Sequence, residues 1–117
     1  MSHVTNYTIF LTVMNTMDGP DDENHLPPIM QRINARLPER QKFDNLDRNA
    51  GGYKNMECGV FGIGGNYLPF DVVRAAILPE IATMDHDGFL LVVLGQHDSA
   101  FSTYTIAQLQ AETEGRW

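Results

Sequence analysis

Apolar and polar residues alternate near the start of the chain and recur with a helical period in two later stretches. Residues 6–14 carry Tyr, Ile, Leu and Val at every second position, which predicts a strand. Residues 26–37 place apolar side chains at spacings of four, three and four behind a Pro-Pro pair, which predicts a helix. Residues 70–84 repeat that period, and Pro79 within them should kink or end the regular helix.

Shorter signals predict the other elements. Strands are expected at residues 55–63 and 89–95, with a weaker one within 40–54. Residues 100–106 suit one more short strand, and the tail 107–117 a final helical turn or two. The order strand, helix, weak strand, strand, helix, strand is typical of the ferredoxin-like, or split βαβ, arrangement.

We therefore expect a single α+β domain over residues 1–117. Its antiparallel sheet should carry two helices on one face and a short C-terminal extension. If residues 40–54 form only a loop, a three-stranded α/β unit is the alternative.

The run Phe89-Leu90-Leu91-Val92-Val93-Leu94 is apolar at every position. In a sheet covered by helices on one face, alternate residues of such a strand should meet water. An apolar second face is large enough to require a cover. Either the segment 100–117 folds over it or a second subunit does. We expect a homodimer through the sheet face or edge, because two-fold dimers are the commonest oligomers.

Composition narrows the class of protein. The single cysteine, Cys58, excludes an intramolecular disulfide and hence a disulfide-built secreted scaffold. The N-terminus lacks the basic and apolar regions of a signal peptide. The longest apolar runs are about six residues, against the ~20 that span a bilayer. We expect a cytoplasmic protein that does not enter a membrane.

The net charge of −7 is unevenly distributed. Residues 1–31 hold four acids and no lysine or arginine, whereas residues 32–54 hold six bases against three acids. An acidic surface repels nucleic-acid phosphates and favours basic partners, so we expect a protein partner and no direct nucleic-acid binding. The candidate protein-binding residues are Asp18, Asp21, Asp22 and Glu23.

Three functional hypotheses follow. The first is a non-catalytic, acidic protein-binding or inhibitory module. Its size and acidity suit an accessory protein encoded by a phage or mobile element, which occludes a basic site on a host nucleic-acid-handling enzyme.

The second hypothesis is a small-ligand or nucleotide-binding protein that uses the glycine-rich segment 62–66. Backbone amides of Gly64, Gly65 and Asn66 could hold a phosphate beside Arg36 and Arg40. The segment lacks the third glycine of a dinucleotide fingerprint and the lysine of a P-loop. A glycine-rich bulge and turn is the competing interpretation.

The third hypothesis is a small dimeric enzyme of the α+β-barrel kind. His86 or His97, with Asp98 and Tyr104, would lie in a cleft under the sheet. The two histidines flank the strand 89–95 at opposite ends, so we expect no shared metal site. Cys58 has no catalytic partner nearby in the sequence, which favours a buried structural thiol. We expect no cofactor, and the absence of a catalytic motif favours the first hypothesis.

Overall fold

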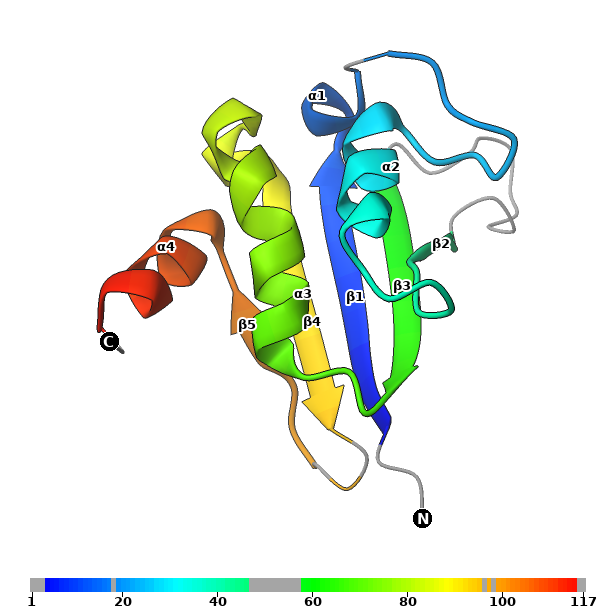
Figure 1. Cartoon of the computed structure of the whole chain (residues 1–117). Helices are drawn as coiled ribbons and strands as arrows, with labels where there is room; N and C mark the ends of the chain where they lie inside the picture. The colour runs from blue at the N-terminus through cyan, green and yellow to red at the C-terminus, as the bar shows by residue number, and fades with distance from the viewer. Residues whose placement is uncertain (1–3, 18, 47–57, 96, 98, 116–117) are drawn as a thin grey trace.

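Five antiparallel strands form one sheet in the order β2-β3-β1-β4-β5 (Figure 1). A computed structural model of the chain describes residues 4–17, 19–46, 58–95, 97 and 99–115. The strands are β1 (Val4–Thr12), β2 (Asp44–Asn45), β3 (Cys58–Asn66), β4 (Phe89–Gly95) and β5 (Ser102–Tyr104). The α-helices are α1 (Val13–Thr16), α2 (Pro28–Ala35), α3 (Phe70–Ile77) and α4 (Ile106–Gly115), and the 3-10 helices are η2 (Leu78–Thr83) and η3 (His86–Gly88).

Strand β1 is the centre of the sheet. It pairs with β3 from Val4 opposite Asn66 to Thr12 opposite Cys58, and with β4 along its other edge. The predicted alternation is confirmed, because Tyr7, Ile9 and Leu11 are at most 1% exposed.

The strand begins and ends two residues earlier than the predicted 6–14. It ends at Thr12 because the chain turns into α1 at Val13. Asn15 explains this turn. Its side chain donates to the Asp85 and Gly88 carbonyls and accepts from the Asp85 N–H, which ties α1 to η3.

The predicted antiparallel α+β architecture is confirmed. Strand β5 lies within residues 100–106, where the sequence predicts one more short strand, and it pairs with β4. The weak strand predicted within 40–54 is only the two residues of β2 in the described part of the chain. Strand β3 begins at Cys58 and continues to Asn66, beyond the predicted end at residue 63, because Gly64 and Gly65 pair with Asn6 and Thr5.

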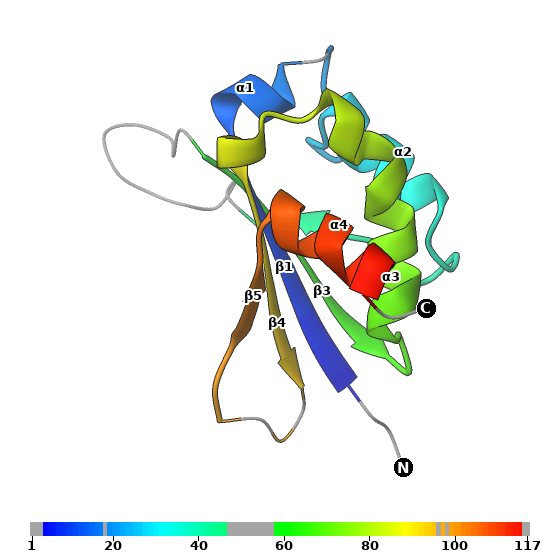
Figure 2. The ribbon, with the colours of Figure 1, turned by 90° about the vertical axis from the view of Figure 1, so that its left-hand side faces the viewer.

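Helices α2, α3 and α4 lie on the same side of the sheet (Figure 2). The predicted stripe of α2 is buried, although the helix itself is shorter than 26–37. Helix α3 gives way to η2 at Leu78, where Pro79 cannot supply the N–H that a continuing α-helix needs. Helix α4 joins this layer through Ile106 and Leu109, both 0% exposed, so a third helix accompanies the predicted two. The buried core contains Leu26, Met30, Ile33, Leu37, Phe61, Leu68, Val73, Ile77, Ile81 and Leu91.

Buried asparagines fix the connection between α2 and β2. The Asn34 amide nitrogen donates to the Phe43 carbonyl at 3.0 Å, and its oxygen accepts from the Phe43 N–H at 2.7 Å. Asn45 donates to the His25 carbonyl at 2.6 Å. These bonds hold the Phe43 ring, 2% exposed, under the sheet.

Replacing Asn34 by alanine should lower the free energy of unfolding by about 2 kcal/mol, because the N–H and C=O of buried Phe43 lose their partner. Asn24→Ala is the matched control, since Asn24 is exposed, and should change stability by less than about 0.5 kcal/mol. Urea unfolding of both variants tests this. Equal losses would show that the Asn34 side chain does not fix the connection.

Tyr7 ties the start of β1 to the connection between β3 and α3. Its hydroxyl donates to the Leu68 carbonyl at 2.7 Å, and burial raises its pKa to about 12. A neutral phenol is therefore favoured in the folded protein. The stabilisation is complete below the unfolded pKa of about 10 and is lost as the pH rises through the folded value.

Between pH 9.5 and 12 the protein should lose about 2–3 kcal/mol more stability than a Tyr7→Phe variant, which has no phenol at this position to ionise. Denaturant unfolding across this range provides the measurement, and groups common to both proteins cancel. Parallel pH profiles for the two proteins would rule out a raised pKa at Tyr7.

Candidate functional site

The second face of the sheet carries apolar side chains that none of the described helices covers. Register places Phe10 of β1 opposite Val60 of β3 and Leu90 of β4, and Thr8 opposite Val92. These residues alternate with the buried ones, so they point away from the helices seen on one side of the strands in Figure 2. We call this surface the uncovered face; its apolar members are Phe10, Val60, Leu90, Val92, Leu94 and, beyond β2, the exposed Leu46.

The described part of the C-terminal helix does not supply the cover. Helix α4 packs among the other helices through Ile106 and Leu109, and its Leu109 carbonyl accepts a hydrogen bond from the Arg74 guanidinium. The sequence left two possible covers for this face, the chain's own tail and a second subunit. The position of α4 excludes the tail for residues 106–111. The second face stays half-exposed in the described structure.

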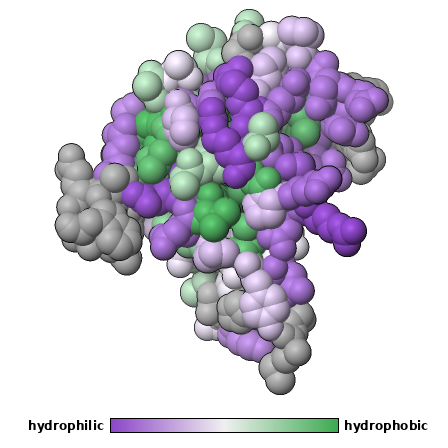
Figure 3. Space-filling view, viewed as in Figure 1, coloured by the Kyte–Doolittle hydropathy of each residue, from purple (hydrophilic) through white to green (hydrophobic). Residues whose placement is uncertain are grey.

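Charge is almost absent from the described strands that form this surface. Asp44 is the only charged residue in the described strands, although the chain as a whole carries −7. The helical side, viewed in Figure 3, is mostly hydrophilic, with apolar side chains in small separate groups. The two sides of the molecule therefore differ in chemistry, and the uncovered face is the one suited to apolar contact.

A shallow hollow of about 130 Å³ lies at the end of this face near η3. Phe10, Leu90, Cys58 and Asp87 line it. Cys58 is half-buried there, so the prediction of a buried structural thiol holds only in part.

The acidic residues expected to bind protein lie on the loop that leads into α2 (Figure 1). Asp18 lies outside the described residues. Asp21 and Glu23 are exposed, whereas the half-buried Asp22 accepts hydrogen bonds from the N–H groups of Asn24 and Leu26. Asp22 therefore shapes the loop, and Asp21 and Glu23 are the acids that it presents.

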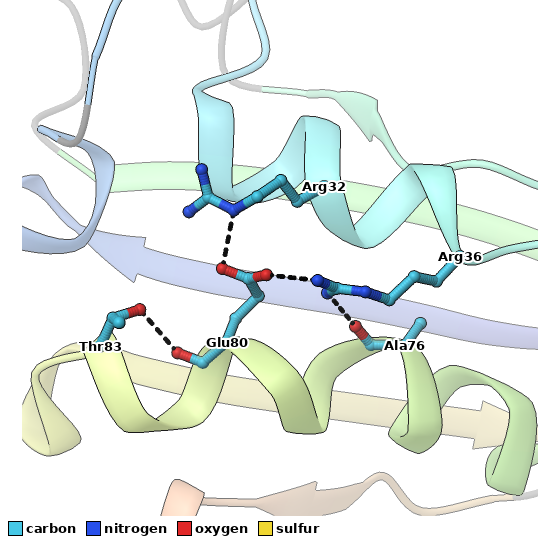
Figure 4. A network of polar contacts seen from close by, with 5 residues as sticks. All are labelled: Arg32, Arg36, Ala76, Glu80 and Thr83. Atoms are coloured by element: carbon cyan, nitrogen blue, oxygen red, sulfur yellow. Dashed lines mark hydrogen bonds and ion pairs between the residues drawn. The ribbon is translucent and has the colours of Figure 1, made fainter.

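Arg36 lies in a polar network between α2, α3 and η2 (Figure 4). Its guanidinium contacts Glu80 at 2.7 Å and donates to the Ala76 carbonyl at 3.0 Å, while Arg32 contacts the other Glu80 oxygen at 2.9 Å. The Glu80 side chain is only 6% exposed. Both arginines neutralise a buried carboxylate of η2. Their spacing of four residues was the available signal, because it puts both on one helix face.

The other residues of the proposed phosphate site are placed differently. Gly64, Gly65 and Asn66 are part of β3, not of a loop between strand and helix. Gln41 donates to the Asn66 carbonyl at 2.6 Å, so the exposed Arg40 lies one residue from that contact. The structure thus joins Gln41 to Asn66 and engages Arg36 with Glu80 and Ala76.

The described residues of the enzyme hypothesis do not share a cleft. His86 precedes β4, His97 follows it, and both are exposed. Asp98 lies outside the described residues. Tyr104 is half-buried against Phe70, with ring centroids 4.8 Å apart. No group of three His, Cys, Asp or Glu side chains in the described part of the chain could hold a metal ion.

Comparison with protein-family models, with curated proteins and with solved structures gave no match to this chain. Among the described residues, none of the helices has the length and apolar character needed to cross a bilayer.

Glu80→Ala should cost about 2 kcal/mol of stability. The loss is smaller than the ~3–5 kcal/mol of a fully buried pair, because Arg32 and Arg36 are 46% and 34% exposed at their side chains. Arg32→Ala should cost less than about 1 kcal/mol, since Arg36 still pairs with Glu80. Denaturant unfolding compares the two variants. A Glu80→Ala protein as stable as Arg32→Ala would show that this network does not hold α2 to η2.

Proposed function

We propose that this protein is a non-catalytic protein-binding module that forms a homodimer through its uncovered face. The observation that carries the proposal is the set of apolar side chains on that face. Asp44 of β2 is the only charged residue in the described strands. Two copies can therefore meet there without opposing the many acids of the chain.

The size of the face supports a second copy as the occupant. Strands spaced about 4.8 Å apart, rising about 3.3 Å per residue, give a surface of roughly 20 Å by 25 Å. A face-to-face pair would cover roughly 500 Å² of flat area on each copy, which reaches the ~1,000 Å² total that specific interfaces need. Two such sheets stack about 10 Å apart with interdigitating side chains, as in a β-sandwich.

The sheet edges are weaker candidates for the dimer contact. At the two ends of the strand order lie β2, with two residues, and β5, with three. Edge strands this short offer few backbone groups for pairing with another chain. The face is therefore favoured over the edge.

We also infer that the sheet is a ferredoxin-like core extended by β5. Strand β3 lies between β1 and β2, and β1 lies between β3 and β4. Since every neighbouring pair is antiparallel, β1 and β2 run in the same direction, as do β3 and β4. Two βαβ units, each split by a strand of the other, would give this order.

The acidic loop is our proposed contact for a basic protein partner in the cytoplasm. Its exposed acids, Asp21 and Glu23, suit an accessory protein of phage or mobile-element origin that occludes a basic nucleic-acid site on a host enzyme.

The protein should then release such an enzyme from DNA in a gel-shift assay. The Asp21→Asn/Glu23→Gln double variant should release less of the enzyme at the same concentration. Retention of DNA at every protein concentration, with each host DNA-binding enzyme tried, would contradict this role.

Val92→Lys should convert the dimer into a monomer. Val92 points away from the helices, so a lysine there is solvated in the monomer but would be buried without a partner charge in the dimer. Sedimentation equilibrium over a range of concentrations should give twice 13.1 kDa for the parent and 13.1 kDa for the variant.

Ala75→Lys is the matched control, because Ala75 is an exposed residue of α3 in the helical layer and the substitution adds the same charge. It should leave the dimer intact, and circular dichroism should show that both variants are folded. A parent protein that sediments as a monomer at all concentrations, or a dimer that survives Val92→Lys, would rule out the uncovered face as the interface.

A further inference from the structure

A cavity of about 510 Å³ opens on the helical side of the sheet, where α3 begins. It lies between the start of β1, the last part of β4 and the connection from β3 to α3, at the lower end of the sheet in Figure 1. Thr5 and Val93 form part of the sheet side, and Leu68 part of the connection. This volume falls within the ~300–1,000 Å³ of small-molecule sites. The cavity is on the opposite side of the sheet from the uncovered face.

Three of the seven described residues that line the cavity are aromatic. Tyr7, Tyr67 and Phe70 line the cavity, and Tyr104 packs behind Phe70 with an interplanar angle of 34°. Aromatic rings prefer offset-stacked or edge-to-face contacts with another ring. The lining therefore favours a flat aromatic molecule over a branched aliphatic one.

The Tyr7 hydroxyl, a polar group of the lining, is already engaged. It donates to the Leu68 carbonyl at 2.7 Å. Among the described residues no charged side chain lines the cavity, and the Asp71 carboxylate contributes to the raised pKa of Tyr7. An ion entering here would lose its hydration without gaining a partner, and an anion would also meet Asp71. The occupant should therefore be uncharged.

Tyr67 at the rim is held in an unusual backbone conformation. Its φ is +57°, in the left-handed region that bulky residues rarely adopt, and its side chain is 64% exposed. A glycine would adopt this conformation without the steric penalty of a Cβ. Strain of this kind is retained mainly at ligand clamps and other functional sites.

We propose that this cavity binds an uncharged, planar aromatic molecule of one or two rings, with Tyr67 closing over it. The site does not depend on the dimer, because none of its lining residues belongs to the uncovered face.

Indole is the probe, and indole-3-acetate is its charged counterpart. Titration into ¹⁵N-labelled protein should shift the amides of Thr5, Leu68, Phe70 and Val93 in a saturable way with indole. The acetate should bind at least tenfold more weakly. The Val92→Lys monomer should bind indole as the parent does, which separates failure of this site from failure of the dimer.

Two variants test the location. Val93→Trp fills the cavity and should weaken indole binding at least tenfold, whereas Val92→Trp, the next residue on the opposite face, should not. Tyr67→Gly should also weaken indole binding, because it removes the aromatic ring. It should raise the urea midpoint, because glycine adopts this positive φ without strain.

Three results would overturn the proposal: no saturable shift with indole, equal affinity for the charged probe, or unchanged binding in both Val93→Trp and Tyr67→Gly. Shifts centred on Phe10, Val60 and Leu90 would also overturn it, because they would place the ring on the uncovered face.

Discussion

A sheet that is covered on one face only is the constraint on which the rest of this structure depends. Strand β1 lies at its centre and turns Tyr7, Ile9 and Leu11 toward the helices, where they are almost completely buried. Because side chains alternate along a strand, the same register turns Phe10 to the other side, between Val60 and Leu90. Because one set of alternate side chains is buried against the helices, the other set remains for contact with another molecule.

Polar contacts hold the helical layer together on the buried side. Glu80 joins η2 to α2 through two guanidinium groups, and Asn34 joins α2 to the chain before β2. Asn15 joins α1 to η3 at one end of the sheet. These contacts order the connections without using any side chain of the uncovered face. The apolar side chains of that face therefore remain for contact with a partner surface.

The elements that could be predicted from the sequence are those whose signal is local. The alternation in β1, the stripe of α2 and the change of helix type at Pro79 are short-range patterns, and residues 89–95 form β4 with the predicted boundaries. The end of β1 could not be predicted, because it depends on Asn15 and Asp85, which are 70 positions apart. The burial of Glu80 depends on arginines more than 40 positions earlier. The aromatic cavity was missed for the same reason, since positions 5–7, 67–70 and 93 converge only in the folded chain.

The run of six apolar residues at 89–94 predicted a second apolar face, and the position of α4 shows that the described tail does not cover it. The most direct test is an isotope-filtered NOE experiment on a mixture of ¹³C-labelled and unlabelled protein. A dimer through the uncovered face predicts intermolecular NOEs from the methyl groups of Val60, Leu90 and Val92, and none from Ile9 or Leu91. Intermolecular NOEs confined to other surfaces, or none at all in a protein that remains monomeric, would contradict the account.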